Sequence, residues 1–226
     1  MTTMDGRRAG RRSRAASRRR PEVDGSLLRW PGAARPFALF AEVLWVGALV
    51  FVVALPVVTW PAAVAAGATH VRRFLYAEAT APSTFFRDAV RALPGALLPG
   101  IGTTILGVVV AVDLALLADG VLPGGALAAT VIGAAGLAVL VLTVLAASLW
   151  SPGAAWRDVW RVLPRVARAD LSGTLSIAVA VGLAAVITWQ FLPLVIPALG
   201  MLVFAAVALG ERRLVRWAAE ADQSGE

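Results

Sequence analysis

The sequence predicts an all-α fold: a polytopic transmembrane helical bundle of about six membrane segments in three hairpins, with two short cytoplasmic interfacial helices. The first observation is composition, since 59% of the residues are hydrophobic and only 15% are charged. Soluble domains average about 45–50% apolar and about 25% charged residues. Second, several apolar runs reach the roughly 20 residues that a membrane span needs. Third, arginine occurs in some gaps between these runs and is absent from the others.

The distribution of arginine predicts how the chain threads the membrane. The arginine clusters fall at residues 7–20, 29–35, 72–73, 87–91, 157–168 and 212–216. The gaps at 56–61, 119–125 and 190–193 contain none. Because cytoplasmic loops carry the positive charge, both termini are predicted to be cytoplasmic. We therefore expect a basic disordered cytoplasmic tail over 1–36, a transmembrane helical domain over 37–213 and a short cytoplasmic tail over 214–226.

The composition also excludes most familiar kinds of catalytic site. The chain has no cysteine and one histidine, His70, and all 21 of its basic residues are arginines. Thiolate nucleophiles, paired-histidine zinc sites and Schiff-base lysines are therefore excluded. We expect no enzyme activity, no metal and no cofactor. Much of the net charge of +7 lies in the N-terminal tail, which we interpret as an anchor to anionic inner-leaflet lipids and not as a nucleic-acid site.

The first apolar run, 37–55, is followed by a corner with two prolines. Pro56 and Pro61 remove backbone donors, so they are expected to break the chain at the outer face. Thr59 between them is a candidate cap for the helix that follows. That following segment, 62–76, is short, and the sequence leaves open whether it spans fully or is re-entrant.

The remaining elements alternate between interfacial helices and spans. Residues 83–93 are predicted as the first interfacial helix and 152–163 as the second, the latter starting at Ser151-Pro152. The expected spans are 95–117, 122–150, 171–189 and 192–209.

Two carboxylates fall within the predicted spans and form a possible intramembrane polar site. Glu42 lies near the inner end of the first span, where we expect it to pair with an arginine. Asp113 lies near the outer end of the third span. Carboxylates in spans often line ion or substrate paths, but at this depth Asp113 can also snorkel outward or accept a hydrogen bond from a threonine.

The most specific local signal is an internal echo, RDxxRxLP, at 87–94 and again at 157–164. Each copy follows an aromatic residue and precedes a pair of predicted spans. It indicates either a repeat, as in many transporter folds, or convergent use of an amphipathic helix with a proline stop. Basic and aromatic faces together are typical of helices in the membrane interface. The candidate residues for a cytoplasmic partner or lipid surface are Arg87, Asp88, Arg91, Arg157, Asp158 and Arg161.

The segment AEVLWVGALVFVVALPVVTWPAAVAAGATHVRRFL, followed by FFRDAVRAL, resembles the N-terminal signature of the YesL-like bacterial integral membrane proteins, a family of unknown function. The resemblance is specific over about 40–93 and only hydropathic afterwards. Trp60-Pro61 and the arginine-rich tail depart from the pattern. It implies a multi-pass protein of the bacterial cell membrane, with an accessory or scaffold role linked to carbohydrate uptake and a sugar ABC importer as its partner.

A second hypothesis is a transporter or an ABC-importer permease-like subunit in its own right. Its support is the proline-broken corner, the ionisable residues within spans, and a loose likeness of residues 78–100 to a permease coupling loop. That stretch lacks the glycine such loops carry at their middle. The sequence leaves the oligomeric state open.

Overall fold

The computed structural model describes residues 31–118 and 125–224, and every regular element in these ranges is a helix. A short 3₁₀ turn, η2 (Pro31–Ala34), precedes α2 (Pro36–Ala54) and α3 (Trp60–Leu75). The long helix α4 (Pro82–Ala118) and α5 (Gly125–Leu149) follow. The chain continues with α6 (Trp156–Ala169), α7 (Leu171–Gln190), a second 3₁₀ turn η3 (Leu192–Leu194) and α8 (Val195–Ser224). The all-α prediction is confirmed for this part of the chain.

Five of the described helices are long and apolar enough to cross a membrane: α2, α4, α5, α7 and α8. The bounds of α2, α5 and α7 lie close to those of the predicted spans, whereas α4 starts earlier and α8 ends later than predicted. The outer turn expected at 119–125 and most of the basic tail, 1–36, lie outside the described residues. The expected boundary at residue 213 does not end a helix, because α8 continues to Ser224.

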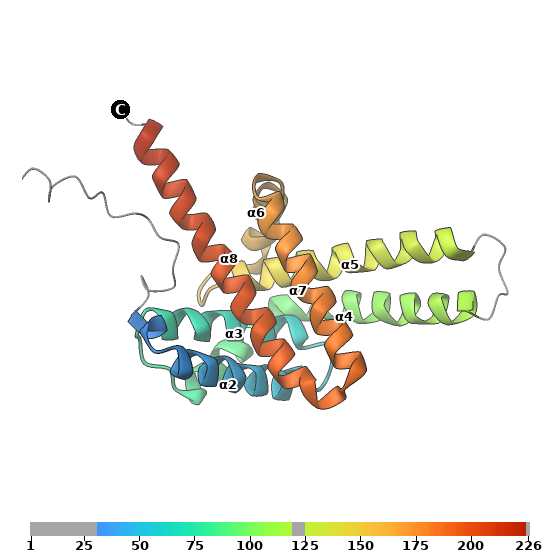
Figure 1. Ribbon diagram of the computed structural model, residues 1–226, viewed down its shortest axis with the longest axis horizontal. Coiled ribbons are helices and arrows are strands. Elements are labelled where there is room, and N and C mark those ends of the chain that lie inside the picture. Colours follow the sequence, from blue (N-terminus) through green and yellow to red (C-terminus); the bar gives the residue numbers. More distant parts are fainter. Residues whose placement is uncertain (1–30, 119–124, 225–226) are drawn as a thin grey trace, which may run out of the picture.

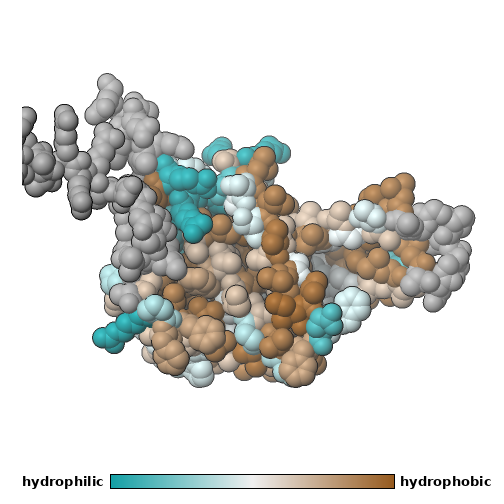
Figure 2. All heavy atoms as spheres, in the orientation of Figure 1, coloured by the Kyte–Doolittle hydropathy of each residue, from teal (hydrophilic) through white to brown (hydrophobic). Residues whose placement is uncertain are grey.

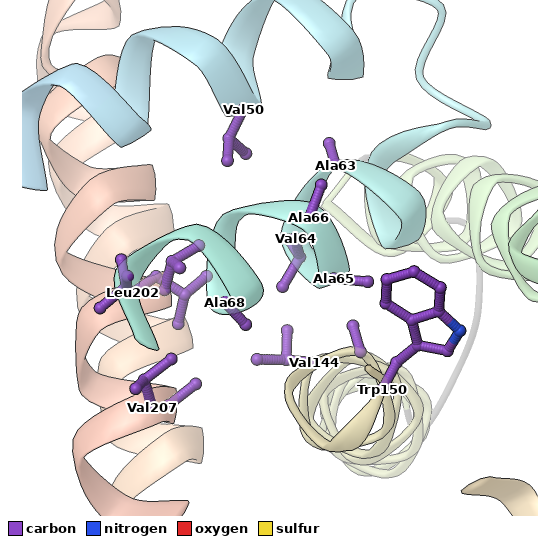
Figure 3. Close-up of a cluster of buried hydrophobic side chains, with 14 of the residues drawn as sticks. Val50, Ala63, Val64, Ala65, Ala66, Ala68, Val144, Trp150, Leu202 and Val207 are labelled. Carbon is purple, nitrogen blue, oxygen red and sulfur yellow. The ribbon is translucent and has the colours of Figure 1, made fainter. Parts of the chain in front are cut away.

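The short segment predicted at 62–76 is the centre of the fold and not a peripheral element. α3 has only 16 residues, and every residue from Pro61 to Val71 is buried. It contacts α2, α4, α5 and α8, so the other helices enclose it (Figure 1). Half of its buried residues are alanine or glycine, which lets neighbouring helices approach closely. Figure 3 shows Val64 and Ala68 of α3 among Val144 of α5 and Leu202 and Val207 of α8.

Glycines also mark the closest helix crossings. A Cβ on Gly47 of α2 would overlap the Ile196 carbonyl of α8, and one on Gly200 of α8 would overlap the Val43 carbonyl of α2. A Cβ on Gly100 of α4 would likewise overlap the Val58 carbonyl. These three positions fix α2 against α8 and the α2–α3 corner against α4.

The expected interfacial helix at 83–93 and the expected span at 95–117 are one continuous helix, so the prediction of a separate first interfacial helix is wrong. α4 runs through both Pro94 and Pro99 without a break. In apolar surroundings a broken helix would leave backbone groups without partners, so the remaining helical bonds are kept and each proline removes only one donor. Pro164 likewise lies inside α6, which runs over 156–169 and not over 152–163. The prolines that end the two RDxxRxLP copies, Pro94 and Pro164, therefore do not end a helix.

The distal parts of α4 and α5 lie side by side and extend together away from the other helices (Figure 1). Large apolar side chains on both are exposed there, including Ile105, Val108, Val112, Leu127 and Val131. Added Cβ atoms at Gly102, Gly107 and Gly133 would meet nothing within 4 Å. In the space-filling view hydrophobic colour covers α7, the lower part of the bundle and part of α4 and α5, whereas hydrophilic colour gathers near α6 and the C-terminal part of α8 (Figure 2).

Candidate functional site

The corner between α2 and α3 forms where the prolines predicted it. α2 ends at Ala54 and α3 begins at Trp60, with Val57 at a φ of 58°. The expected cap is wrong, since the Thr59 hydroxyl makes no bond to the α3 N-terminus and instead donates to the Val53 carbonyl of α2. Trp60 Nε1 donates to Thr103 Oγ1 of α4 at 2.9 Å. The corner is therefore held from both neighbouring helices.

Three ionisable side chains near the end of α3 together reach four other helices. His70 Nε2 lies 2.7 Å from Glu42 Oε1 of α2, and His70 is completely buried. Arg73 lies 2.6 Å from Asp88 Oδ2 of α4. Arg72 donates to the Ser148 carbonyl at the end of α5 and pairs with Glu211 of α8.

The partner of Arg72 is itself held in place. Tyr76 Oη donates to Glu211 Oε2 at 2.6 Å, while Arg72 Nε lies 3.6 Å from the other carboxylate oxygen. The Glu211 side chain is 7% exposed. The central helix is thus joined by polar contacts to α2, α4, α5 and α8 at one end of the bundle. We call these contacts, made by His70, Arg72, Arg73 and Tyr76, the α3 polar hub.

Asp170 organises a second polar cluster between α6 and α7. Its Oδ1 accepts from the Gly173 amide and the Ser172 hydroxyl, each at 3.1 Å, so it caps α7. Arg213 Nε donates to Oδ2 at 3.0 Å and Arg216 Nη2 lies 2.9 Å from Oδ1, both from α8. Burial alone would raise the pKa of Asp170, but hydrogen bonds from Arg216, the Gly173 amide, Arg213 and Ser172 outweigh it and lower the pKa from 3.8 to about 2.

The two RDxxRxLP copies carry their arginines on the surface but differ in their aspartates. Arg87, Arg91, Arg157 and Arg161 are all exposed. Asp88 is completely buried, whereas the Asp158 side chain is 58% exposed and pairs with Arg161 on its own helix at 3.3 Å. Arg91 Nη1 also lies 3.9 Å from Asp88 Oδ1. Each aspartate thus lies near the arginine three residues ahead of it, but in the first copy the aspartate is buried and Arg73 of α3 is its nearer partner.

The apolar side of α6 packs on protein. Trp156, Val159, Leu163 and Val166 are buried, and α6 contacts α4, α5 and α7. Trp156 stacks between Trp150 and Trp160 and donates through Nε1 to the Ala92 carbonyl at 2.9 Å. The aromatic face expected to lie in lipid therefore packs on the bundle, and the arginines lie on the exposed side of α6.

The two predicted intramembrane carboxylates lie in different surroundings. Glu42 pairs with His70 and not with an arginine as expected. Asp113 is half-buried on α4, and among the described residues no hydrogen bond or ion pair joins it to a neighbour. The two carboxylates do not form one site, since Glu42 belongs to the α3 polar hub.

Two of the cavities among the described helices are apolar. The larger, about 640 Å³, lies among α2, α3, α5, α7 and α8, with Val64, Val144, Val181 and Leu202 in its wall. The smaller, about 230 Å³, lies between α4 and α5 beside Gly107 and Gly136. No group of three or more potential metal ligands occurs among the residues that the structure describes.

Sequence reasoning missed Tyr76, Asp170, Glu211 and Arg213 as members of polar clusters. Each lies next to the end of an apolar run, where charge is expected in any membrane protein. The signal that could have separated Asp170 is its position directly before an apolar run with Ser172 and Gly173, which is typical of a helix cap. No comparable pattern marks Glu211.

No family model matches this chain, and neither a curated protein nor a solved structure matches it.

Proposed function

We propose that this protein is a multi-pass accessory or scaffold protein of the bacterial cell membrane that docks a partner through the basic side of α6. The observation that carries the proposal is the arrangement of α6. Its apolar side is buried against the bundle, while Arg157 and Arg161 have side chains 74% and 67% exposed. Arg165 and Arg168 continue the exposed row.

The interior supports a scaffold better than a transporter. The buried ionisable side chains of the α3 polar hub and of Asp170 contact side chains of other helices and so join the helices to one another. Both cavities are lined almost wholly by apolar side chains, which offer an ion or a sugar few partners. Such an interior suits a rigid body that presents a surface.

The proposed threading has six segments, with α3 as a short enclosed sixth beside the five long helices, and both termini in the cytoplasm. The arginine distribution supports it. A reporter of membrane side fused after Asp119 should report the outer side of the membrane. The same reporter fused after Asp170 should report the cytoplasm. A cytoplasmic signal from the Asp119 fusion would refute the six-segment threading.

The YesL-like resemblance over residues 40–93 supports a link to carbohydrate uptake, with a sugar ABC importer as the proposed partner. Extraction in mild detergent should then recover the ATPase or permease of that importer with this protein. Flux of a sugar or an ion through proteoliposomes that contain the isolated chain alone would favour the transporter alternative.

The docking surface is tested by charge reversal on α6. Arg157→Glu with Arg161→Glu should leave insertion and folding unchanged, because both side chains are exposed, yet should abolish co-purification of the partner. The matched control is Arg35→Glu with Arg212→Glu, two exposed arginines outside α6, one directly before α2 and one on α8. If the α6 double variant recovers the partner in full, α6 does not dock a partner and its arginines only contact the membrane.

A further inference from the structure

The α7 N-terminus holds more positive charge than its one carboxylate neutralises. Asp170 faces two guanidinium groups, Arg213 and Arg216, at 3.0 and 2.9 Å. The free backbone amides of a helix N-terminus add a further partial positive charge. The Gly173 amide, the Ser172 hydroxyl and both guanidinium groups all donate to this one carboxylate. Asp170 therefore cannot accept from the remaining N–H groups of either arginine.

Arg213 has N–H donors without hydrogen-bond acceptors. Its side chain is 3% exposed, and only Nε has a partner. Within the described part of the chain, Nη1 and Nη2 are enclosed without a hydrogen-bond acceptor. The bond from Nε to the α7 cap holds this guanidinium at the helix N-terminus. A buried cation left without acceptors is costly, so an anion with two available oxygens would stabilise the cluster.

The geometry points to a binding site for a phosphate group, formed by Arg213 and Arg216 at the N-terminus of α7. Arginine binds phosphate through paired N–H donors, and helix N-termini favour the same anion. Arg216, with its side chain 55% exposed, lies at the accessible side of the site. The site uses none of the α6 arginines of the docking surface, so it does not depend on the proposed function.

An anionic phospholipid headgroup is the source of phosphate that the surroundings favour. Leu214 and Trp217 on the same stretch of α8 are 58% and 41% exposed, which leaves apolar surface beside the arginines for an acyl chain. Basic pockets between helices at the cytoplasmic side commonly bind such headgroups.

The test measures lipid retention on the full chain by native mass spectrometry. The protein in mild detergent is mixed with phosphatidylglycerol or with phosphatidylcholine of the same acyl chains. Arg216→Gln should lower retention of phosphatidylglycerol about fivefold, the ratio that follows from losing one arginine–phosphate contact near a membrane surface. Retention of phosphatidylcholine should not change. Arg35→Gln, which removes an exposed arginine at the start of α2, should match the wild type.

A second arm distinguishes the lipid from free phosphate. If millimolar inorganic phosphate raises the melting temperature of the wild type but not of Arg216→Gln, while lipid retention is equal in both, the site serves a soluble phosphate. Arg213→Gln repeats both arms, and Arg216→Gln alone decides if the Arg213 variant fails to fold. Equal phosphatidylglycerol retention by wild type and Arg216→Gln, together with no response to inorganic phosphate, would overturn the proposal.

Discussion

The two copies of the RDxxRxLP pattern place the same aspartate in opposite environments. Asp88 in the first copy is completely buried and lies 2.6 Å from Arg73 of α3. Asp158 in the second copy has a side chain 58% exposed, and its partners are Arg157 and Arg161 of its own helix. The first copy is the start of the 37-residue helix α4, whereas the second is a 14-residue helix that ends before Asp170.

The neighbouring helix explains the difference. The first copy packs on α3, which carries Arg73 in its last turn, so the carboxylate has a cation to meet inside the bundle. Where α6 is buried, it instead offers Val159 and Leu163 to α5, α4 and α7. The pattern thus keeps the arginines at the surface in both copies, and the packing partner decides what the aspartate does.

The copies also touch each other. Trp156, the residue before the second copy, lies against Gly95, the residue after the first, and donates to the Ala92 carbonyl. In the second copy the residue that corresponds to Gly95 is Arg165, which is exposed. The second copy therefore packs on the first through a contact that has no counterpart in the opposite direction. A symmetric repeat would have the contact in both directions.

Asp88→Asn should produce the largest difference between the copies. Breaking a buried ion pair costs about 3–5 kcal/mol, because Arg73 would keep its charge without a counterion. We expect a large fall in the melting temperature of the detergent-solubilised protein. The melting temperature is measured as the loss of the folded peak in size-exclusion chromatography after heating.

The double variant Arg73→Gln with Asp88→Asn provides the control. It should be less damaging than the sum of the two single changes, because neither charge is then left alone. Strict additivity of the three variants would show that the Arg73–Asp88 contact contributes nothing, and the comparison between the copies would fail.

Gly95→Val should have the second-largest effect. A Cβ at Gly95 would overlap atoms of the Trp156 ring, so the side chain would push α6 off α4. We expect a loss of up to about 3 kcal/mol from overpacking and from the Trp156–Ala92 hydrogen bond. Arg165→Val, at the corresponding position of the second copy, is the matched control and should leave the melting temperature nearly unchanged. Equal losses in both variants would mean that the two positions are equivalent after all.

The sequence predicted the apolar spans within the five long helices because a run of apolar residues is a local property. The corner at Pro56 and Pro61 was equally local, since proline acts on its own turn. The ion pairs between helices could not be predicted this way. Asp88 has Arg91 three residues ahead, so a local pair is the simplest expectation, and nothing in the chain near it indicates Arg73 fifteen residues earlier.

The same limit explains His70 and Glu42. They lie 28 residues apart, and their pairing depends on how α2 crosses α3, which the Gly47 and Gly200 contacts between α2 and α8 help to set. The central place of α3 was also unpredictable from hydropathy. Its alanines are only moderately apolar, and it is their small size that lets four helices surround them.

Asp170 lies directly after α6, the helix that carries the second copy, and its effect on stability should depend on pH. Its pKa is lowered from 3.8 to about 2 by its hydrogen bonds, so it contributes stability at pH values above its unfolded pKa. That contribution, about 2 kcal/mol, is lost as the pH falls from about 4 toward 2. The difference in melting temperature between wild type and Asp170→Asn should therefore be full at pH 6 and shrink on acidification below pH 4. A difference that stays constant down to pH 3 would contradict the ionised, hydrogen-bonded Asp170.

Asp158→Asn should have the smallest effect and completes the comparison. The exposed pair with Arg161 spans 3.3 Å and, like other surface pairs, contributes about 0.2–1 kcal/mol. Since both side chains are more than half exposed, water replaces the lost partner, and we expect a value near the lower end. Added salt should leave the variant and the wild type even closer, because screening weakens an exposed pair. A melting temperature lowered as far as that of Asp88→Asn would mean that the second copy is held by its aspartate too, and that α6 presents less of its basic side than the proposed docking surface requires.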